Sequence, residues 1–219
     1  MAGRASVRGV VLAGGESRRF EGGDKALADL GGRPLLAHAV GAVDAATDRA
    51  PLLAVATHEE GDRLTRALSD GGDRVEVVVD DPSFAGPLAG LVVAAGQTDR
   101  PWLLVCGCDM PLVSPQTFGT LRDYAGPGID AVVPVVDGHD QSLHALYRGD
   151  AVVANAAGLE ERGPRALLER FDNVRRVAAA DVDEALATAV TNVNTREDLE
   201  AVRDRIETAR GDTRDEGAN

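Results

Sequence analysis

Short apolar runs that alternate with helix-like segments constrain the fold of this sequence more than any other feature. Each run is rich in Val or Leu and is apolar at odd and even positions alike, which is typical of strands buried on both faces of a parallel sheet. The expected strands are Val7–Leu12, Leu52–Thr57, Val75–Val79, Trp102–Cys106 and Ala131–Val136. The expected helices are Pro34–Ala46, Asp62–Leu68, Pro87–Ala95 and Ser114–Tyr124. This alternation predicts an α/β fold with one doubly wound, mostly parallel sheet flanked by helices.

The last third of the sequence is less regular, although it contains the same kinds of element. Further strands are expected at Gln141–Tyr147 and Arg175–Ala179, and further helices at Ala151–Leu159, Pro164–Phe171 and Thr195–Ala209. No linker divides the chain, so residues 1–209 are expected to form one domain. Residues 210–219 carry no apolar anchor, and we expect them to be a disordered tail.

The composition limits the core and the partners of the protein. Hydrophobic residues make up 44% of the chain but aromatic residues only 3%, so the core must consist mainly of Val, Leu and Ala. The net charge of −13 and the absence of a basic patch argue against nucleic-acid binding. The acidic residues are scattered, as on a solvated acidic surface. A protein from a host with high internal salt would also have such a surface, because salt screens its self-repulsion.

Two further observations concern location. No apolar run approaches the roughly 20 residues that a membrane helix needs. The N-terminus runs directly into the first expected strand and does not resemble a signal peptide. We therefore expect a cytoplasmic protein without a membrane partner, in which Cys106 and Cys108 are buried, reduced thiols.

A glycine-rich segment, LAGGESRRFEGGDKAL at residues 12–27, follows the first expected strand. In an open α/β sheet, ligands bind at the carboxyl ends of the strands, and glycine backbone can approach an anion closely. The segment contains neither the G-x-G-x-x-G of dinucleotide sites nor the Gly-Lys-Ser/Thr of a Walker loop. Lys25, the only lysine of the chain, is a compact point charge, whereas arginine is a planar fork. We therefore predict a different kind of phosphate loop, in which Lys25 contacts the phosphates.

Three further segments are expected near this loop. Asp109 follows the fourth expected strand and could hold Mg²⁺, which takes one or two carboxylates together with substrate phosphates. Asp80 or Asp81, after the third strand, could accept hydrogen bonds from a base or a ribose. Asn192 and Asn194 point to one side if their segment is extended, although turn and capping roles would explain them too.

Five motifs, LAGGESRRF, DKAL, GPLAG, CDMP and NVNTREDL, resemble in content and order those of the MobA-type molybdenum cofactor guanylyltransferase family. The similarity runs from about Val7 to Leu199. Sugar nucleotidyltransferases share variants of the first motif, but the five together are specific. The resemblance implies a Rossmann-like nucleotidyltransferase fold and an enzyme that transfers GMP from GTP to molybdopterin and releases pyrophosphate. It implies GTP and molybdopterin as partners, with other proteins of cofactor biosynthesis or acceptor proteins beyond them.

The resemblance also implies roles for individual residues. The nucleotide-binding set would be Leu12, Ala13, Gly14, Gly15, Lys25, Asp80 and Asp109. The catalytic set would be Arg19, Lys25 and Asp109, with Asp109 as the Mg²⁺ ligand. Asn192 and Asn194 would lie on the pterin-phosphate side, and the segment that contains His139 and His144 is a second candidate for that side.

The sequence departs from the family pattern at a few positions. Phe20-Glu21 replaces Met-Gly, Arg196 replaces Pro, and Thr57 stands where relatives often have Asn. LAGG resembles the guanine-using branch of the family rather than the cytidylyl branch. The alternatives that remain open are cytidylyl transfer to molybdopterin, nucleotidyl transfer to a sugar phosphate or corrinoid precursor, and a GTP-binding accessory module without catalysis.

Overall fold

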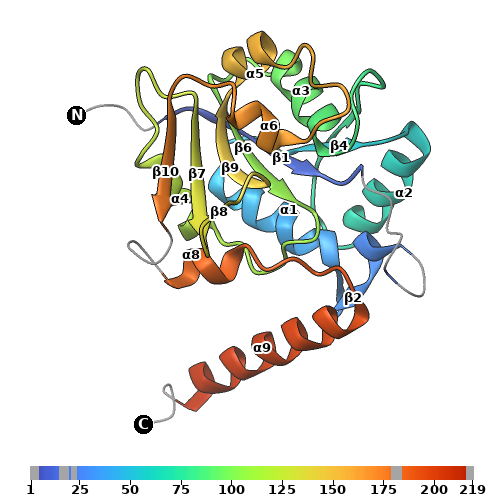
Figure 1. The fold of residues 1–219 in the computed structure, drawn as a ribbon. Coiled ribbons are helices and arrows are strands. Elements are labelled where there is room, and N and C mark those ends of the chain that lie inside the picture. Colours follow the sequence, from blue (N-terminus) through green and yellow to red (C-terminus); the bar gives the residue numbers. More distant parts are fainter. Residues whose placement is uncertain (1–4, 15–19, 21–23, 179–183, 216–219) are drawn as a thin grey trace.

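The structure, a computed structural model, describes residues 5–14, 20, 24–178 and 184–215. Within these ranges, eight strands form one sheet in the order β10-β7-β9-β6-β1-β4-β5, with β8 paired to β7 (Figure 1). Their bounds are β1 Val7–Leu12, β4 Leu52–Val55, β5 Glu76–Val79, β6 Trp102–Gly107, β7 Ala131–Val136, β8 His139–Asp140, β9 His144–Arg148 and β10 Val174–Ala178. A separate hairpin pairs β2 (Asp29–Leu30) with β3 (Arg33–Pro34).

Most neighbouring strands of the sheet are parallel. β6, β1, β4 and β5 run in one direction, and β7 pairs with β10 in the same way. β9 runs antiparallel to both β6 and β7, and the short β8 runs antiparallel to β7. The predicted mostly parallel α/β sheet is therefore confirmed, and the carboxyl ends of β6, β1, β4 and β5 meet at one edge.

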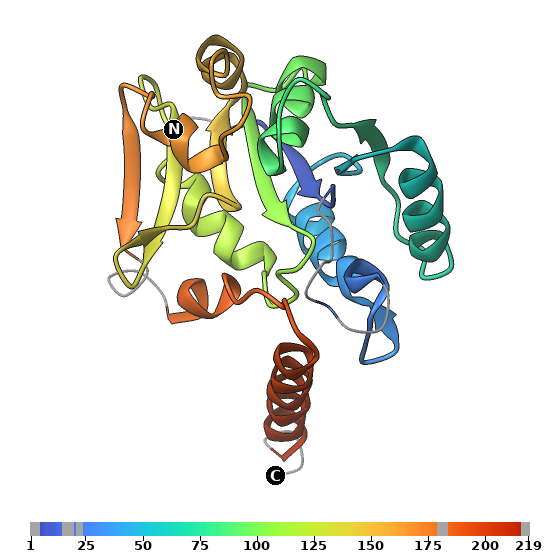
Figure 2. The same cartoon turned by 45° about the vertical axis from the view of Figure 1, so that its right-hand side comes forward.

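Helices cover both faces of the sheet, as a doubly wound fold requires (Figures 1 and 2). The helices are η1 Lys25–Leu27, α1 Leu35–Ala46, α2 His58–Ser69, α3 Pro87–Gln97, α4 Pro115–Arg122, α5 Gly149–Asn155, α6 Pro164–Leu168, α8 Glu184–Ala189 and α9 Arg196–Asp215. Residues of α1, α2, α4 and α8 share one buried cluster, whereas residues of α3, α5 and α6 share another. The two clusters lie on opposite faces of the sheet.

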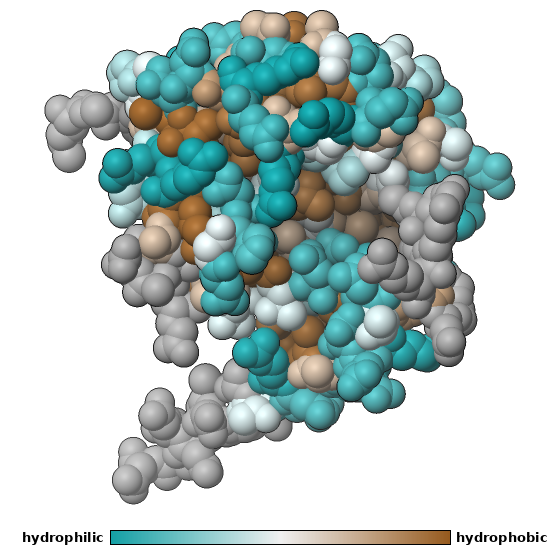
Figure 3. Space-filling view, in the orientation of Figure 1, coloured by the Kyte–Doolittle hydropathy of each residue, from teal (hydrophilic) through white to brown (hydrophobic). Residues whose placement is uncertain are grey.

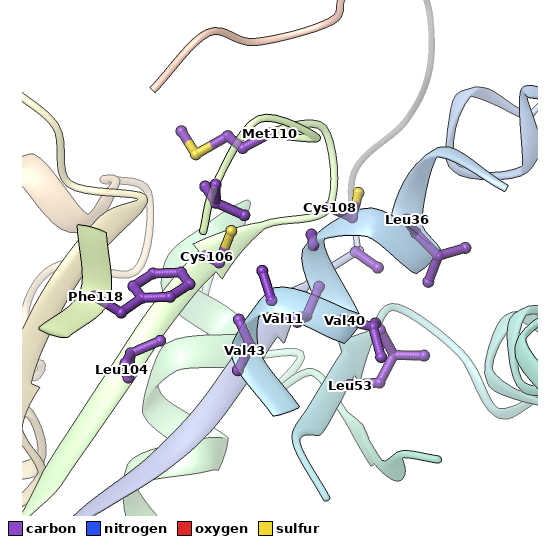
Figure 4. Close-up of a cluster of buried hydrophobic side chains, with 14 of the residues drawn as sticks. Val11, Leu36, Val40, Val43, Leu53, Leu104, Cys106, Cys108, Met110 and Phe118 are labelled. Carbon is purple, nitrogen blue, oxygen red and sulfur yellow. The ribbon is translucent and has the colours of Figure 1, made fainter. Parts of the chain in front are cut away.

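Alternate residues of each central strand face the two clusters. On one face, Val11 of β1, Leu53 of β4 and Leu104 of β6 lie in the cluster that also contains Val40 and Val43 of α1 (Figure 4). Their neighbours along the strands, such as Val10, belong to the cluster on the other face. A run that is apolar at every position is therefore the pattern that this double covering needs.

The strand at the edge of the sheet departs from the sequence-based prediction. Val77 of β5 is 38% exposed, so β5 is not buried on both faces. The reason is its position, since β5 pairs only with β4 and stands at one end of the strand order. An apolar run alone does not distinguish an edge strand from a central one.

Helix α9 projects from the body of the molecule (Figure 2). It is anchored at its first turns, where Leu199 and Val202 join a third buried cluster with Phe20, Leu30 and Val193. The helix extends to Asp215, past the end at residue 209 that the sequence predicts. Gly211 is tolerated inside it, at an intrinsic cost of about 1 kcal/mol relative to Ala.

His144 lies in a strand, as expected, but it is fully buried in β9 and so is not available to face the pterin side. Its ring stacks on that of Phe118, with 4.7 Å between the ring centroids. Burial lowers the pKa of His144 to about 3, so the imidazole is neutral, and neither ring nitrogen has a hydrogen-bond partner among the described residues. Antiparallel insertion of β9 between β6 and β7 buries a residue that the sequence places beside polar neighbours.

Candidate functional site

A pocket opens at the carboxyl ends of β1, β4, β5 and β6, where the sequence predicts a ligand site. Its cavity measures about 120 Å³ and is lined by Leu12, Ala13, Gly14, Asp24, Lys25, Ala26, Ala54, Asp80, Pro87, Gly90, Gly107, Cys108, Asp109 and Leu143. In Figure 3 the surface around it is mostly hydrophilic, and apolar residues show in the recess near the middle of the view. The described members of the predicted nucleotide-binding set, from Leu12 to Asp109, all line this one cavity.

The side of the pocket around Asp109 holds an ion pair. Lys25 Nζ donates to Asp109 Oδ2 over 2.8 Å, and the two side chains are only 15% and 20% exposed. Lys25 comes from η1, while Asp109 comes from the turn after β6, where Cys108 N donates to Leu12 O over 3.0 Å. A pair that is mostly shielded from water is screened less by salt than a surface pair. We call Lys25, Asp109 and Asn194 the Asp109 side of the pocket.

Asn194 joins this pair from the far end of the chain. Lys25 Nζ donates to Asn194 Oδ1 over 3.2 Å, and Val193 N donates to Asp109 O over 2.8 Å. The predicted second-substrate residue Asn194 therefore contacts the lysine directly. Asn192 and Asn194 are both exposed and neither is among the residues that line the pocket, so Asn194 reaches the site through its contact with Lys25.

Asp24 fixes the start of the short helix that carries Lys25. Its Oδ1 accepts a hydrogen bond from Ala26 N over 3.0 Å, as an N-cap does. Its Oδ2 lies 2.6 Å from Arg63 Nη2 of α2. These two contacts fix the start of η1 and therefore orient Lys25, a role that the sequence alone does not indicate for Asp24.

The other side of the pocket presents a carboxylate between two glycines, and we call Gly14, Asp80 and Gly90 the Asp80 side. Asp80 directly follows β5, and Asp80 N donates to Val55 O over 2.8 Å. A Cβ atom on Gly14 would lie 2.1 Å from Asp80 Oδ2, and one on Gly90 would lie 2.9 Å from Asp80 Oδ1. Both positions therefore require glycine if Asp80 is to keep its place.

Asp80 is electrostatically strained. Among the described residues, no donor reaches its buried Oδ1 atom. Burial, and next the nearby Glu60 carboxylate, raise the pKa of Asp80 from 3.8 to about 6. Glu60 is itself held in place, because its Oε2 accepts from Ala56 N over 2.9 Å. A ligand that donates hydrogen bonds to Asp80 would relieve this strain.

The structure also gives the roles of Thr57 and Cys108, two residues at or near the site. Thr57, at a position where the family resemblance leads us to expect Asn, caps α2 by accepting a hydrogen bond from Glu60 N over 3.1 Å. Burial, with the Asp109 carboxylate second, raises the pKa of the Cys108 thiol to about 12, so Cys108 stays protonated at the wall of the pocket. Both cysteines are free and buried.

Two predicted site residues, Gly15 and Arg19, lie outside the described residues. Phe20 lies in the buried cluster beside Leu199 and Val202, and its ring centroid is 5.8 Å from Arg196 Cζ. The aromatic ring that replaces the family's Met is thus packed against α9.

The donor set of the Asp109 side fits a hard cation such as Mg²⁺. The Asp109 carboxylate and the Asn194 amide each accept a hydrogen bond from the Lys25 ammonium, so their oxygen atoms already face a cation. In the described part of the chain, no group of three or more His, Cys, Asp or Glu residues comes together to hold a metal. A metal ion here would therefore depend on ligand phosphates and water for its remaining ligands, as Mg²⁺ commonly does.

Within the described ranges, no helix combines the length and the apolar character that crossing a membrane requires.

Comparisons with known proteins agree with the pocket. The family described as MobA-like NTP transferase domain matches residues 9–205. A protein of Natronomonas pharaonis named probable molybdenum cofactor guanylyltransferase is 30% identical over 201 residues, which cover 90% of this chain and 97% of the relative. A protein of the same name from Bacillus cereus is 34% identical, covering 87% of this chain and 92% of its own.

A solved structure has the same fold. The crystal structure of molybdopterin-guanine dinucleotide biosynthesis protein A from Archaeoglobus fulgidus superposes with a TM-score of 0.74 at 23% identity, covering 92% of this chain and 99% of that one. At this identity the likeness supports the fold, and the sequence relatives support the family.

Proposed function

The chain belongs to the family of MobA-like NTP transferase domains, and from this premise we propose that it transfers GMP from GTP to molybdopterin and releases pyrophosphate. The product would be the guanine dinucleotide form of the molybdenum cofactor. The observation that carries the proposal is the ion pair between Lys25 and Asp109 inside the pocket. Phosphoryl transfer between two anions needs cationic charge near the phosphates and an oxygen ligand for a metal ion, and this pair offers both.

In the proposed complex, the nucleoside lies against Leu12, Ala13 and Gly14, and Asp80 accepts hydrogen bonds from it. Two observations support this placement: Asp80 Oδ1 has no donor among the described residues, and Gly14 and Gly90 leave space around the Asp80 carboxylate. Gly15 and Arg19 would complete the triphosphate site, on the strength of the sequence alone. Asn192, which is exposed and directly precedes the residue whose N–H donates to Asp109 O, would face the pterin phosphate.

Nucleotidyltransferases of this family generally use a divalent metal ion, and we propose that Asp109 holds Mg²⁺. When bound, Mg²⁺ would neutralise charge on the phosphates during transfer. Lys25 would donate hydrogen bonds to the phosphate oxygens on which negative charge develops. Its ammonium would have to share or leave Asp109 as the phosphates arrive, and the flexible stem of lysine permits this.

The reaction proposed is one displacement at phosphorus. A terminal phosphate oxygen of molybdopterin forms a bond to the α-phosphorus of GTP while the bond from that phosphorus to the bridging oxygen breaks. Pyrophosphate leaves with the electron pair. The chain contributes positioning and electrostatic stabilisation rather than a covalent nucleophile. The protonated state of the Cys108 thiol is consistent with this.

The test is pyrophosphate release with GTP, CTP, ATP and UTP, each with and without molybdopterin. Release that requires both GTP and molybdopterin supports the proposal. A preference for CTP would move the protein to cytidylyl transfer, and release with a sugar phosphate or a corrinoid precursor instead of molybdopterin would change the acceptor. GTP binding without release under any condition would indicate an accessory module.

A further inference from the structure

The position of the Lys25 ammonium depends on a segment near the C-terminus. Lys25 and Asn194 are 169 residues apart in the sequence, yet Lys25 Nζ lies 3.2 Å from Asn194 Oδ1. The same segment is tied to the pocket by the hydrogen bond from Val193 N to Asp109 O, 2.8 Å long. A shift of this segment would therefore move one of the two oxygens that hold the ammonium.

Asp198, in the first turn of α9, holds that segment in place. Its Oδ2 atom accepts hydrogen bonds from Asn194 N and from Thr195 N, each over 2.8 Å. Asp198 N in turn donates to Thr195 Oγ1 over 3.1 Å. Thr195 and Asp198 thus form the two halves of a capping box, with Asp in place of the usual Glu or Gln.

The hydrogen bond that Asp198 accepts from Asn194 N is not needed to cap the helix. A capping box needs the side chain in the first turn to reach the N-cap backbone, and the bond to Thr195 N already does this. The hydrogen bond from Asn194 N is the largest cause that holds the pKa of Asp198 below its ordinary value, and the charge of Lys25 acts in the same direction. Asp198 is therefore coupled to both members of the contact.

We propose that Asp198 is a positioning residue for the nucleotide site, because it fixes Asn194 so that the Asn194 amide oxygen keeps the Lys25 ammonium beside Asp109. This inference rests on the proposed function in one respect, namely that Lys25 donates hydrogen bonds to the phosphates of GTP from this position. It gives Asn194 the role of supporting the lysine instead of contacting the acceptor. The packing of Leu199 and Val202 against Phe20 and Val193 anchors the turn of α9 from which Asp198 acts.

The single lysine makes this geometry directly measurable. Protein labelled with ¹³C only in lysine contributes one lysine side chain to an NMR spectrum. In the nucleotide-free protein, Asp198→Ala should move the Cε–Hε resonances of Lys25 toward those of an unconstrained lysine, as Asn194→Ala should. Asp198→Asn keeps an acceptor oxygen and should restore part of the wild-type shift.

Thr195→Ala is the matched control. It removes the hydroxyl half of the same capping box but leaves the Asp198 carboxylate on Asn194 N. Thr195→Ala and Asp198→Ala should both lower the melting temperature by about 2–4 °C, as loss of a cap does. Only Asp198→Ala should move the Lys25 resonances. Equal shifts in both variants, or unmoved resonances in Asp198→Ala, would overturn the proposal.

Activity gives the second readout. Asp198→Ala should lower kcat for pyrophosphate release on the order of 10–100-fold, as loss of an outer support does, with a smaller change in KM. Adding Asp198→Ala to Asn194→Ala should then cost little more, because both act on one contact. Additive losses of kcat in the double variant would contradict the proposal that Asp198 and Asn194 act through one contact. If the resonances respond but the wild-type protein releases no pyrophosphate, the positioning stands and the proposed function fails.

Discussion

The two sides of the pocket carry the same functional group in opposite electrostatic states. Asp109 is paired with Lys25 over 2.8 Å, whereas the Oδ1 atom of Asp80 has no donor among the described residues and Glu60 lies nearby. The two carboxylates follow β6 and β5, and the strands β1 and β4 separate them in the sheet. One side is already neutralised before a ligand arrives, and the other is not.

This difference indicates how one pocket can hold a ligand that is anionic at one end and rich in hydrogen-bond donors at the other. The Asp109 side offers a cation, which phosphates require, together with oxygen atoms for a metal. The Asp80 side offers a desolvated acceptor, which a ligand with N–H or O–H groups would satisfy. The predictions that follow test whether the two sides differ in this way, beginning with the largest effect.

Removal of the cation from the Asp109 side should have the largest effect. By analogy with deleted oxyanion donors, Lys25→Ala should lower kcat for pyrophosphate release on the order of 10²–10³-fold. Arg33→Ala is the control, since it breaks an ion pair with Asp73, 2.7 Å long, that lies outside the pocket. A loss as large in Arg33→Ala as in Lys25→Ala would show that the effect comes from stability.

Lys25→Arg tests a finer point on the same side. Arginine keeps the charge but spreads it over a planar fork, which fits poorly where one ammonium meets both Asp109 Oδ2 and Asn194 Oδ1. We expect Lys25→Arg to bind GTP and to lose much of its turnover, measured as kcat at saturating GTP. Full activity in Lys25→Arg would mean that charge alone matters at this position.

Loss of the carboxylate on the Asp109 side should change the response to metal ions. Asp109→Asn keeps the size of the side chain and an acceptor oxygen for Lys25, but it removes the negative charge that a divalent cation requires. The concentration of Mg²⁺ that gives half-maximal pyrophosphate release should therefore rise. An unchanged Mg²⁺ dependence would place the metal ligand elsewhere in the protein.

Part of this site could be predicted because local sequence patterns specify the strands that position it. The continuous apolar runs Val7–Leu12 and Ala131–Val136 give β1 and β7 with the predicted bounds. Once parallel strands were expected, Lys25, Asp80 and Asp109 had to lie near one edge of the sheet, and the structure brings all three to one cavity. Strand periodicity and chain order were sufficient for this.

The remainder depends on contacts that no local pattern encodes. The approach of Asn194 to Lys25 needs the path of the irregular last third, including α8 (Glu184–Ala189), which the sequence analysis does not predict. The burial of His144 needs the antiparallel direction of β9, and alternation of residues along a strand carries no direction. Glu60 lies between the expected strand that ends at Thr57 and the expected helix that begins at Asp62, but in the structure it belongs to α2 and is close enough to raise the pKa of Asp80.

Adding a methyl group on the Asp80 side should affect stability and GTP binding less than the substitutions of Lys25 and Asp109 affect turnover, and more than a change of pH. In Gly90→Ala, the new Cβ would lie 2.7 Å from Ala54 Cβ and 2.9 Å from Asp80 Oδ1. Overpacking of this kind costs about 1–3 kcal/mol of unfolding free energy and should also weaken GTP binding. Denaturant unfolding and equilibrium GTP titration measure the two effects.

Gly96→Ala, in the same helix α3, is the matched control for this variant. Apart from its own turn of helix, no described residue has an atom within 4 Å of a Cβ at Gly96, so the substitution should leave GTP binding unchanged and stabilise the helix by up to about 1 kcal/mol. If Gly90→Ala behaved like Gly96→Ala, the close packing around Asp80 would not matter to the ligand.

The smallest predicted effect is a pH dependence that belongs to the Asp80 side alone. Because folding raises the pKa of Asp80 from 3.8 to about 6, the folded state holds this proton more tightly than the unfolded state does. The contribution of Asp80 to stability is therefore present below about pH 4 and is lost as the pH rises through about 6. Asp80→Asn cannot ionise, so its melting temperature relative to the wild-type protein should rise across this window and level off above it.

Thermal melts of both proteins between pH 4 and pH 7 would measure this difference, and Asp81→Asn controls for loss of a negative charge in the same turn. Glu60→Gln should shift the midpoint of the wild-type curve to lower pH, because it removes the carboxylate that repels Asp80. Saturating GTP should do the same, since a nucleoside that donates hydrogen bonds to Asp80 favours its ionised form. A difference between wild type and Asp80→Asn that stays constant across the window would mean that Asp80 is solvated like any surface carboxylate, and the contrast with Asp109 would then disappear.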